Sequence, residues 1–173
     1  MQTAHALPAE TGVDQEAFRL ALSRFATGIA LVTTRNGKGD AFAITINAFS
    51  SVSLDPPLVL FCLGRSAFHY ETFARAETFA VNVLSVDQQA LSDRFAREAE
   101  DHFPDLETGR MATGSPILTG CLAALDCRTE ACHEAGDHLI IIGRVDAVDI
   151  SADRQPLIYF GSRYGELKPG GER

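Results

Sequence analysis

A segment rich in small hydroxyl side chains, residues 45–55, separates two strand-like apolar runs at 41–46 and 58–63. It contains one threonine, one asparagine and three serines, and Asp55-Pro56-Pro57 closes it. Hydroxyls, an amide and backbone N–H groups that are not committed to a sheet can bind a ligand phosphate or a ribityl chain. The segment therefore predicts a polar loop that holds a ligand.

Arg65 and Ser66 directly follow the second apolar run and offer a guanidinium and a hydroxyl side by side. With Ser66 as the N-cap, we expect a helix that runs to about Ala76. A helix start favours an anion, and a guanidinium matches the geometry of phosphate. The pair therefore predicts a phosphate site, and the alternative for Arg65 is a surface ion pair.

His138 is the histidine with the most informative context. It follows the turn signal Gly136-Asp137 and precedes the apolar run 139–142. This position is expected to place it at the mouth of a barrel. The alternative is a solvent-facing histidine on a hairpin. The other histidines are expected on the surface: His5, His69, His102 and His133.

Composition limits the kind of protein. With 173 residues, 46% of them hydrophobic, the chain is long enough for one globular domain, expected at 13–167 between a flexible arm (1–12) and a tail (168–173). The net charge of −8 argues against nucleic acid and anionic membranes as partners. Residues 1–12 lack a signal-peptide pattern, so a cytoplasmic protein is expected. Neither a Gly-x-Gly-x-x-Gly nor a Walker loop is present, which excludes both standard dinucleotide schemes.

Four cysteines, Cys62, Cys121, Cys127 and Cys132, occur in apolar strand-like runs without a Cys-x-x-Cys pair. A zinc site formed by Cys127, Cys132 and His133 would match no standard ligand spacing. We therefore expect reduced, mostly buried thiols and no metal.

The elements that must position these residues follow from apolar periodicity and turn signals. Asp14 can cap a helix that Gly28 would end. Its residues Phe18, Leu22 and Phe25 recur on one face. Strands at hairpin spacing with few helices favour an antiparallel barrel over a doubly wound α/β fold. Strands are expected at 28–35, 41–46, 58–63, 79–84, 123–133, 138–150 and 157–160, turns at 36–40 and 136–137, a helix at 88–95 capped by Asp87, and a surface loop at 97–114.

Six motifs, in order, resemble those of the two-component flavin reductases, whose fold is the FMN-binding split barrel. The resemblance extends from about residue 18 to residue 167. The motifs are Phe25-Ala26-Thr27-Gly28 leading into Val32-Thr33-Thr34, Thr45-Ile46-Asn47-Ala48-Phe49, Ser51-Val52-Ser53-Leu54-Asp55-Pro56-Pro57, Phe79-Ala80-Val81-Asn82-Val83-Leu84, Gly136-Asp137-His138 with Gly143, and Pro156-Leu157-Ile158-Tyr159-Phe160 with Arg163-Tyr164.

The resemblance implies a mainly β (α+β) fold, an antiparallel, Greek-key-like split β-barrel with short helices. It also implies an NAD(P)H:flavin oxidoreductase that passes hydride from NADH or NADPH to FMN or FAD. Reduced flavin would then reach a separate flavin-dependent monooxygenase. Members of the family are usually homodimers with the flavin near the subunit interface, which we carry over as an expectation.

The resemblance also implies the site residues. His138 would be the catalytic residue and would bind nicotinamide with Arg163 and Tyr164. For Arg163 and Tyr164, the alternatives are a snorkelling arginine and a packed tyrosine. For the side chain of Cys62, which is expected to lie near the flavin, the alternative is core packing. Cofactor binding is expected at Thr45, Ile46, Asn47, Ala48, Ser51, Val52, Ser53, Cys62, Leu63, Arg65, Ser66 and Phe95.

One departure from the family pattern leaves open which flavin this chain binds. Ala43-Ile44 precede Thr45, and the β-branched Ile46 follows it where a small residue is usual, which could narrow the flavin bed. FMN, FAD and riboflavin therefore remain possible ligands. The functional alternatives are reduction of a metal chelate or a corrinoid on the same barrel, and non-enzymatic flavin binding. A pyridoxamine-phosphate-oxidase-like function would call for more basic residues than this acidic chain has.

Overall fold

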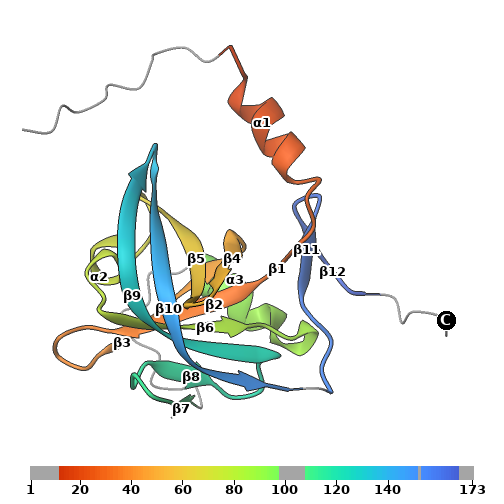
Figure 1. Ribbon diagram of the computed structural model, residues 1–173. Coiled ribbons are helices and arrows are strands. Elements are labelled where there is room, and N and C mark those ends of the chain that lie inside the picture. Colours follow the sequence, from red (N-terminus) through yellow and green to blue (C-terminus); the bar gives the residue numbers. More distant parts are fainter. Residues whose placement is uncertain (1–11, 98–107, 152, 168–173) are drawn as a thin grey trace, which may run out of the picture.

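The computed structural model describes residues 12–97, 108–151 and 153–167. The predicted arm apart from Gly12, the predicted tail, and most of the loop predicted at 97–114 lie outside these ranges, as do His5 and His102. Within them the chain is mainly antiparallel β with three α-helices (Figure 1). The expected fold class is confirmed.

Seven strands form one strongly curved sheet. Their order across the sheet is β3-β2-β6-β9-β10-β5-β4, and each neighbouring pair is antiparallel. Hairpins join β2 to β3, β4 to β5 and β9 to β10 (Figure 1). The bounds are β2 Ala30–Arg35, β3 Ala41–Ile46, β4 Phe49–Leu54, β5 Pro57–Gly64, β6 Thr78–Val83, β9 Ala123–Ala135 and β10 His138–Ile150.

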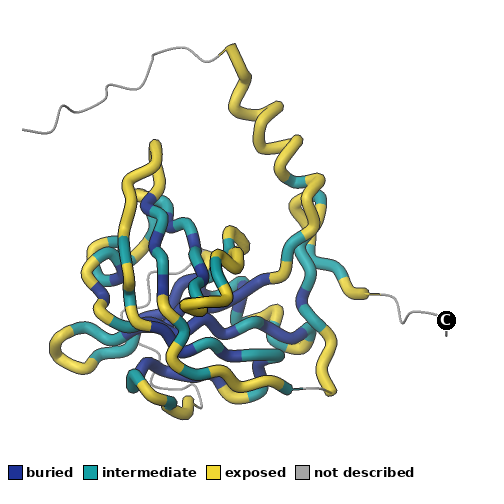
Figure 2. Tube along the Cα trace, in the orientation of Figure 1, coloured by how far each residue is buried: buried dark blue, intermediate teal, exposed yellow. Residues whose placement is uncertain are grey.

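The sheet closes around one apolar interior. Side chains alternate between the two faces of a strand, so Val32 lies in the interior while its neighbour Leu31 packs on the outside. The interior cluster combines Phe42 and Ile44 from β3 with Phe61 from β5, two strands near opposite ends of the sheet order. Strands so far apart in the sheet share one core only if the sheet is a barrel. The buried segments concentrate there (Figure 2).

Two smaller sheets and two of the three helices lie around the barrel. A second cluster, including Leu31, Leu84 and Phe95, packs α3 against the outer face of β2 and β3. The helices are α1 Gln15–Leu22, α2 Tyr70–Ala74 and α3 Gln89–Arg97, with a 3₁₀ turn at Val86–Gln88. One small sheet contains β1 Thr27–Gly28, β11 Ile158–Phe160 and β12 Arg163–Gly165, and the other contains β7 Thr108–Arg110 and β8 Pro116–Leu118.

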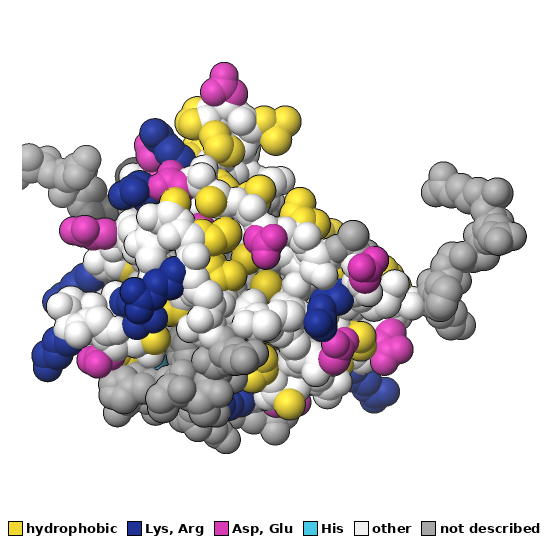
Figure 3. All heavy atoms as spheres, turned by 90° about the horizontal axis from the view of Figure 1, so that it is seen from below, with side chains coloured by type: hydrophobic (Ala, Val, Ile, Leu, Met, Phe, Trp, Pro, Cys, Tyr) yellow, Lys and Arg dark blue, Asp and Glu magenta, His cyan; other side chains and the backbone are white. Residues whose placement is uncertain are grey.

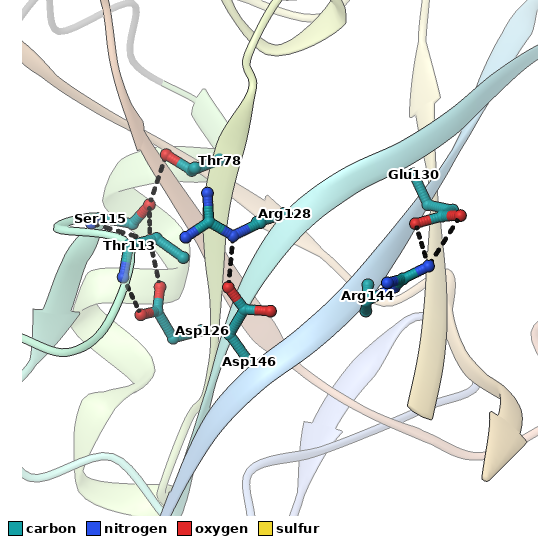
Figure 4. A network of polar contacts seen from close by, with 8 residues as sticks. All are labelled: Thr78, Thr113, Ser115, Asp126, Arg128, Glu130, Arg144 and Asp146. Atoms are coloured by element: carbon teal, nitrogen blue, oxygen red, sulfur yellow. Dashed lines mark hydrogen bonds and ion pairs between the residues drawn. The ribbon is translucent and has the colours of Figure 1, made fainter. Parts of the chain in front are cut away.

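A buried carboxylate fixes the loop before β8 to the barrel (Figure 4). Asp126 is fully buried, and its carboxylate accepts hydrogen bonds from the backbone N–H (2.7 Å) and the hydroxyl of Thr113. Ser115 Oγ continues the network to Thr78 Oγ1 at 3.2 Å. The neighbouring ion pairs of β9 and β10, Arg128–Asp146 and Arg144–Glu130, lie on the exposed side.

Helix α1 extends away from the barrel (Figures 1 and 2). As predicted, Asp14 caps it, and its carboxylate accepts a hydrogen bond from the Ala17 N–H. None of its residues is buried, although Phe18, Leu20 and Leu22 are large and apolar. No helix within the described residues is long and apolar enough to span a bilayer.

Charges of both signs are interspersed on the face seen from below (Figure 3). The visible described part of this face therefore carries no continuous basic surface. Such a surface would be needed for a polyanionic partner.

The structure corrects several local predictions. Helix α1 ends at Leu22 rather than at Gly28, and Thr27–Gly28 form strand β1 instead. Strand β7 lies within the segment that was predicted as a surface loop. Part of the segment predicted as a polar loop is strand β4. Its serines do not favour a strand, but it pairs with β5 through a ladder of backbone hydrogen bonds. Ser66 caps no helix, because α2 begins only at Tyr70 after the left-handed His69. Ser85, not Asp87, caps the turn before α3, through reciprocal bonds with Gln88. Short strands β7, β8 and β12 were not predicted.

Candidate functional site

Two adjoining cavities lie beside the junction of β3 and β4. The larger has a volume of about 610 Å³ and the smaller about 140 Å³. Four residues line both: Phe25, Thr27, Asn47 and Phe49. The larger volume falls within the range of ligand pockets. A hollow of about 740 Å³ near α2 is larger still, but no predicted site residue lines it.

The walls of the larger cavity come from segments far apart in the chain. One wall is the outer face of β4 and β5, with Ser50, Leu60 and Cys62. The opposite wall is the end of α1 and the residues that follow it. The tip of the β11–β12 hairpin completes the wall, since the Gly161 N–H donates to the Ser23 carbonyl at 2.8 Å. The lining residues that sequence reasoning did not assign are Arg19, Leu22, Ser23, Phe25, Thr27, Phe49, Ser50, Leu60, Tyr159 and Ser162.

Asn47 and Ala48 form the connection between β3 and β4. They therefore lie where a strand ends, as predicted. Both are exposed and both line the larger cavity. The Ala48 carbonyl accepts a hydrogen bond from the Cys62 N–H at 3.0 Å, which fixes this connection against β5. Among the described residues, the Asn47 amide has no hydrogen-bond partner. It is therefore available to a ligand.

Three predicted cofactor residues have their side chains committed elsewhere. The Thr45 hydroxyl donates to the Ser92 carbonyl at 2.9 Å. Leu63 lies in the barrel interior and Phe95 in the second cluster, at 1% and 4% exposure. Ile46 is also buried, but it lines the smaller cavity. Only the backbone of the first three is left to contact a ligand without repacking.

The predicted residues of β4 divide in the same way. Ser51 and Val52 are exposed, and neither lines a cavity. The Ser53 hydroxyl accepts a hydrogen bond from the Asp55 N–H at 3.2 Å. Ser50, which the sequence did not single out, is the serine that lines the larger cavity.

Arg65 and Ser66 are exposed on the turn after β5, outside both cavities. Arg65 Nη2 lies 3.0 Å from Glu134 Oε2, so the surface ion pair considered from the sequence is present. Both side chains keep much of their exposure, 47% and 74%. An ion pair this exposed contributes little stability, and an anionic ligand can replace it.

His138 lies at the start of β10, opposite Gly64 of β5. A Cβ on Gly64 would lie 3.6 Å from the imidazole, an ordinary van der Waals distance, so the ring lies directly beside Gly64. His138 Nδ1 lies 2.7 Å from Asp137 Oδ1, and this hydrogen bond lowers the pKa of the Asp137 carboxyl. The histidine is half-exposed, so it is accessible beside the same turn as Arg65.

Arg163 and Tyr164 belong to β12, and neither lines a cavity. The Tyr164 hydroxyl lies 2.9 Å from Ser92 Oγ and donates to Asp93 Oδ1 at 3.2 Å. Burial raises the pKa of this phenol. Tyr164 thus holds the β11–β12 hairpin against α3, which is the packed tyrosine considered from the sequence. Arg163 is exposed.

The described residues contain no cluster of three or more His, Cys, Asp or Glu that could hold a metal ion. All four cysteines are free, but only Cys121 and Cys127 are buried, so the prediction of mostly buried thiols is correct for two of the four. Burial raises the pKa of the Cys127 thiol to about 12, with the charges of Asp126 and Asp146 adding to the effect.

A bound flavin is expected to protect Cys62 from alkylation. The half-buried Cys62 lines the larger cavity, and burial raises the pKa of its thiol, so it should react slowly with iodoacetamide even without flavin. Excess FMN should slow labelling of Cys62 several-fold, measured by peptide mass mapping. The exposed Cys132 lines neither cavity and is the internal control. Labelling of Cys62 at the same rate with and without flavin would contradict this placement.

Comparison with known proteins shows which sequences and structures this chain resembles. Residues 22–168 match the family described as flavin reductase like domain. The chain is 42% identical over 156 residues to the FMN reductase (NADH) SmoA of Agrobacterium fabrum, covering 90% of this chain and 88% of that protein. It is 35% identical to the reductase subunit HsaB of a flavin-dependent monooxygenase of Rhodococcus jostii, covering 93% and 82%.

Two solved structures are similar along almost their whole length. One is the flavin reductase PheA2, with 36% identity and a TM-score of 0.83, covering 91% of this chain and all of that one. The other is the Streptomyces globisporus NADH:FAD oxidoreductase SgcE6 in complex with NAD and FAD fragments, with 31% identity and a TM-score of 0.85, covering 92% and 96%.

Proposed function

This chain belongs to the flavin reductase family, and we propose that it passes hydride from NADH to a flavin and supplies the reduced flavin to a separate flavin-dependent monooxygenase. The observation that carries the proposal is the match of residues 22–168 to the family, joined to a ligand-sized cavity at the family's motif residues. Relatives named as an FMN reductase (NADH) and as a monooxygenase reductase subunit support both halves of the reaction.

The larger cavity suits a flavin. Its volume of about 610 Å³ can hold a tricyclic ring, and apolar side chains such as Phe49 and Leu60 line it. Polar groups lie at its edge, including the available amide of Asn47. The buried Thr27 hydroxyl has no hydrogen-bond partner, so it too can serve a ligand.

The residues of the site bind and orient rather than react. A bound flavin supplies the hydride-accepting chemistry. Residues that line the larger cavity form no acid–base pair, and hydride transfer between two stacked rings does not require one. Holding two reactants in a productive geometry is worth up to about 7–11 kcal/mol of barrier. Phe49, Leu60 and Asn47 would provide that orientation for the flavin, and His138 for the nicotinamide.

We further propose FMN or FAD as the flavin and NADH as the donor. The two named relatives that specify their flavin differ, one using FMN and the other FAD, and both use NADH. NADPH would need an extra basic partner for its 2′-phosphate.

Anaerobic stopped-flow absorbance tests the proposed function. Protein with FMN, FAD or riboflavin is mixed with NADH or NADPH while the absorbance of oxidised flavin is followed at roughly 450 nm. Rapid bleaching is expected, with the fastest pair identifying flavin and donor. Flavin that binds without bleaching would overturn the reductase. Flavin that bleaches but never leaves the protein would overturn the supply of a separate monooxygenase and favour another acceptor.

Replacing His138 with alanine is expected to lower kcat/KM for NADH about 10- to 100-fold, because the nicotinamide loses an orienting contact. Flavin affinity should change little, since His138 lines neither cavity. Steady-state kinetics with a flavin titration separates the two effects. His133→Ala is the matched control, an exposed histidine on the neighbouring strand β9. If His138→Ala and His133→Ala both kept the kcat/KM of the wild type for NADH, His138 would not belong to the site.

A homodimer is the second part of the proposal. An eight-residue helix is marginal in water by itself, and α1 buries none of its residues in this chain. Its exposed residues Phe18 and Leu20 (55% and 56%) are two positions apart and lie on opposite sides of the helix, so α1 exposes apolar side chains on both sides. We propose that a second copy covers at least one of these sides.

We also propose a cytoplasmic location. It is supported by the four free cysteines and can be tested by cell fractionation.

Light scattering after size exclusion is expected to give twice the chain mass of 18.7 kDa. The double variant Phe18→Glu, Leu20→Glu should shift it to the monomer, because it places a charge on each of the two sides of α1 that a second copy could cover, and a charge is costly to bury without a partner. Glu16→Ala on the same helix should leave the dimer intact. A wild-type monomer, or a double variant that remains dimeric, would contradict a dimer formed through α1.

A further inference from the structure

Thr27 carries a polar atom that the fold leaves without a partner. Within residues 12–97, 108–151 and 153–167, two buried side-chain polar atoms have no hydrogen-bond partner, Thr27 Oγ1 and Arg35 Nε. Burying a hydroxyl without a partner is unfavourable, and in native proteins such an atom calls for an explanation, often a ligand or a water. The rest of the fold does not supply one for Thr27.

The position of Thr27 points to a ligand. It lines both cavities, at their junction, together with Asn47. The pairing of β1 with β11 places it opposite Tyr159, which also lines the larger cavity. A rotation about χ1 exchanges the positions of the hydroxyl and the methyl group of threonine. The oxygen can therefore turn toward a bound ring without any movement of the backbone.

We propose that Thr27 is a flavin-binding residue whose hydroxyl hydrogen-bonds the polar edge of the flavin ring. The inference rests on the proposed function and adds to it a contact that the sequence did not assign. The larger cavity, about 610 Å³, is the one that can take a tricyclic ring, because the smaller has only about 140 Å³. A hydroxyl both donates and accepts, so it matches the carbonyl oxygens and the N–H of that edge.

The proposal predicts opposite effects on stability and on binding. Thr27→Val keeps the shape of the side chain but removes the hydroxyl. Flavin-free protein should then melt about 2–4 °C higher, because a buried polar atom without a partner is gone. Affinity for FMN, FAD and riboflavin should fall about tenfold each, a change of about 1.4 kcal/mol, because all three share the ring. Thermal unfolding and fluorescence titration without NADH measure the two.

Two variants complete the design. Thr27→Ser keeps the hydroxyl, so its flavin affinity should stay within about threefold of the wild type. Thr34→Val makes the same substitution where the hydroxyl does have a partner, the Thr78 carbonyl at 2.7 Å, in a residue that lines neither cavity. It should lower the melting temperature and leave flavin affinity unchanged.

The outcomes separate the possible roles. Unchanged flavin affinity in Thr27→Val would overturn the proposal, because a water would then be the partner. A raised KM for NADH at unchanged flavin affinity would also overturn it and move the hydroxyl to the nicotinamide. A fall in both stability and affinity would mean a structural role, again against the proposal. Wild-type protein that binds no flavin would overturn both this contact and the proposed function.

Discussion

Replacing Arg65 with alanine is expected to weaken FMN and FAD about 10- to 100-fold and to leave riboflavin affinity nearly unchanged. A hydrogen bond to a charged group contributes about 1.5–3 kcal/mol, and each 1.4 kcal/mol is a factor of ten in affinity. Only the phosphorylated flavins would lose such a bond. Fluorescence titration of all three flavins against the same protein measures the ratio.

The ion pair with Glu134 provides the control for this experiment. Arg65 Nη2 lies 3.0 Å from Glu134 Oε2, and both side chains are largely exposed. Glu134→Gln keeps the shape of the partner but frees the guanidinium, so FMN affinity should stay the same or rise. Equal weakening of riboflavin and FMN in Arg65→Ala would count against a phosphate contact. A loss of FMN affinity in Glu134→Gln would show that the carboxylate positions Arg65.

The strands could be predicted wherever local chemistry marks both their ends. Strands β3 (Ala41–Ile46) and β10 (His138–Ile150) match the predicted ranges, because turn residues precede each of them and the apolar pattern continues to their ends. The turn at 36–40 formed as expected, with Asn36 Oδ1 accepting from the Lys38 and Asp40 N–H groups.

Strand β4 shows why the rest of the fold was not predictable. Its serines carry no strand signal, and its ladder comes entirely from β5. Ser50 and Ser51 are exposed, and β4 is the last strand of the sheet. Edge strands often carry polar side chains, which makes them resemble loops in a sequence.

The candidate site could be predicted in part. Asn47, Ala48 and Cys62 line the larger cavity, and they belong to one short stretch of chain. Thr27 and Tyr159 were present in the motifs but unassigned, because their proximity depends on the pairing of β1 with β11, far away in the sequence. An apolar face was predicted for α1 but its exposure was not, since periodicity identifies an apolar face and not the surface that covers it.

Gly143→Ala is expected to destabilise the protein by about 2–3 kcal/mol, which corresponds to a melting temperature about 4–12 °C lower. Gly143 is an inward-facing position of β10, and a Cβ there would overlap the Phe79 ring and lie 3.1 Å from Cys127 Cβ. The ring cannot retreat, because Phe79 is 1% exposed and packs edge-on against Phe61 at 5.2 Å. Close packing of this kind makes even one added methyl group costly.

Gly165→Ala in β12 is the matched control for this substitution. Its Cβ would meet no heavy atom within 4 Å, so the free energy of unfolding should change by less than about 0.5 kcal/mol. Urea unfolding of the two variants and the wild type compares them directly, with equal m-values expected. If Gly143→Ala unfolded at the wild-type urea concentration, the interior would have to be loose enough to shift Phe79. The barrel core would then not be the rigid support that β5 needs to hold Leu60 and Cys62 in the cavity wall.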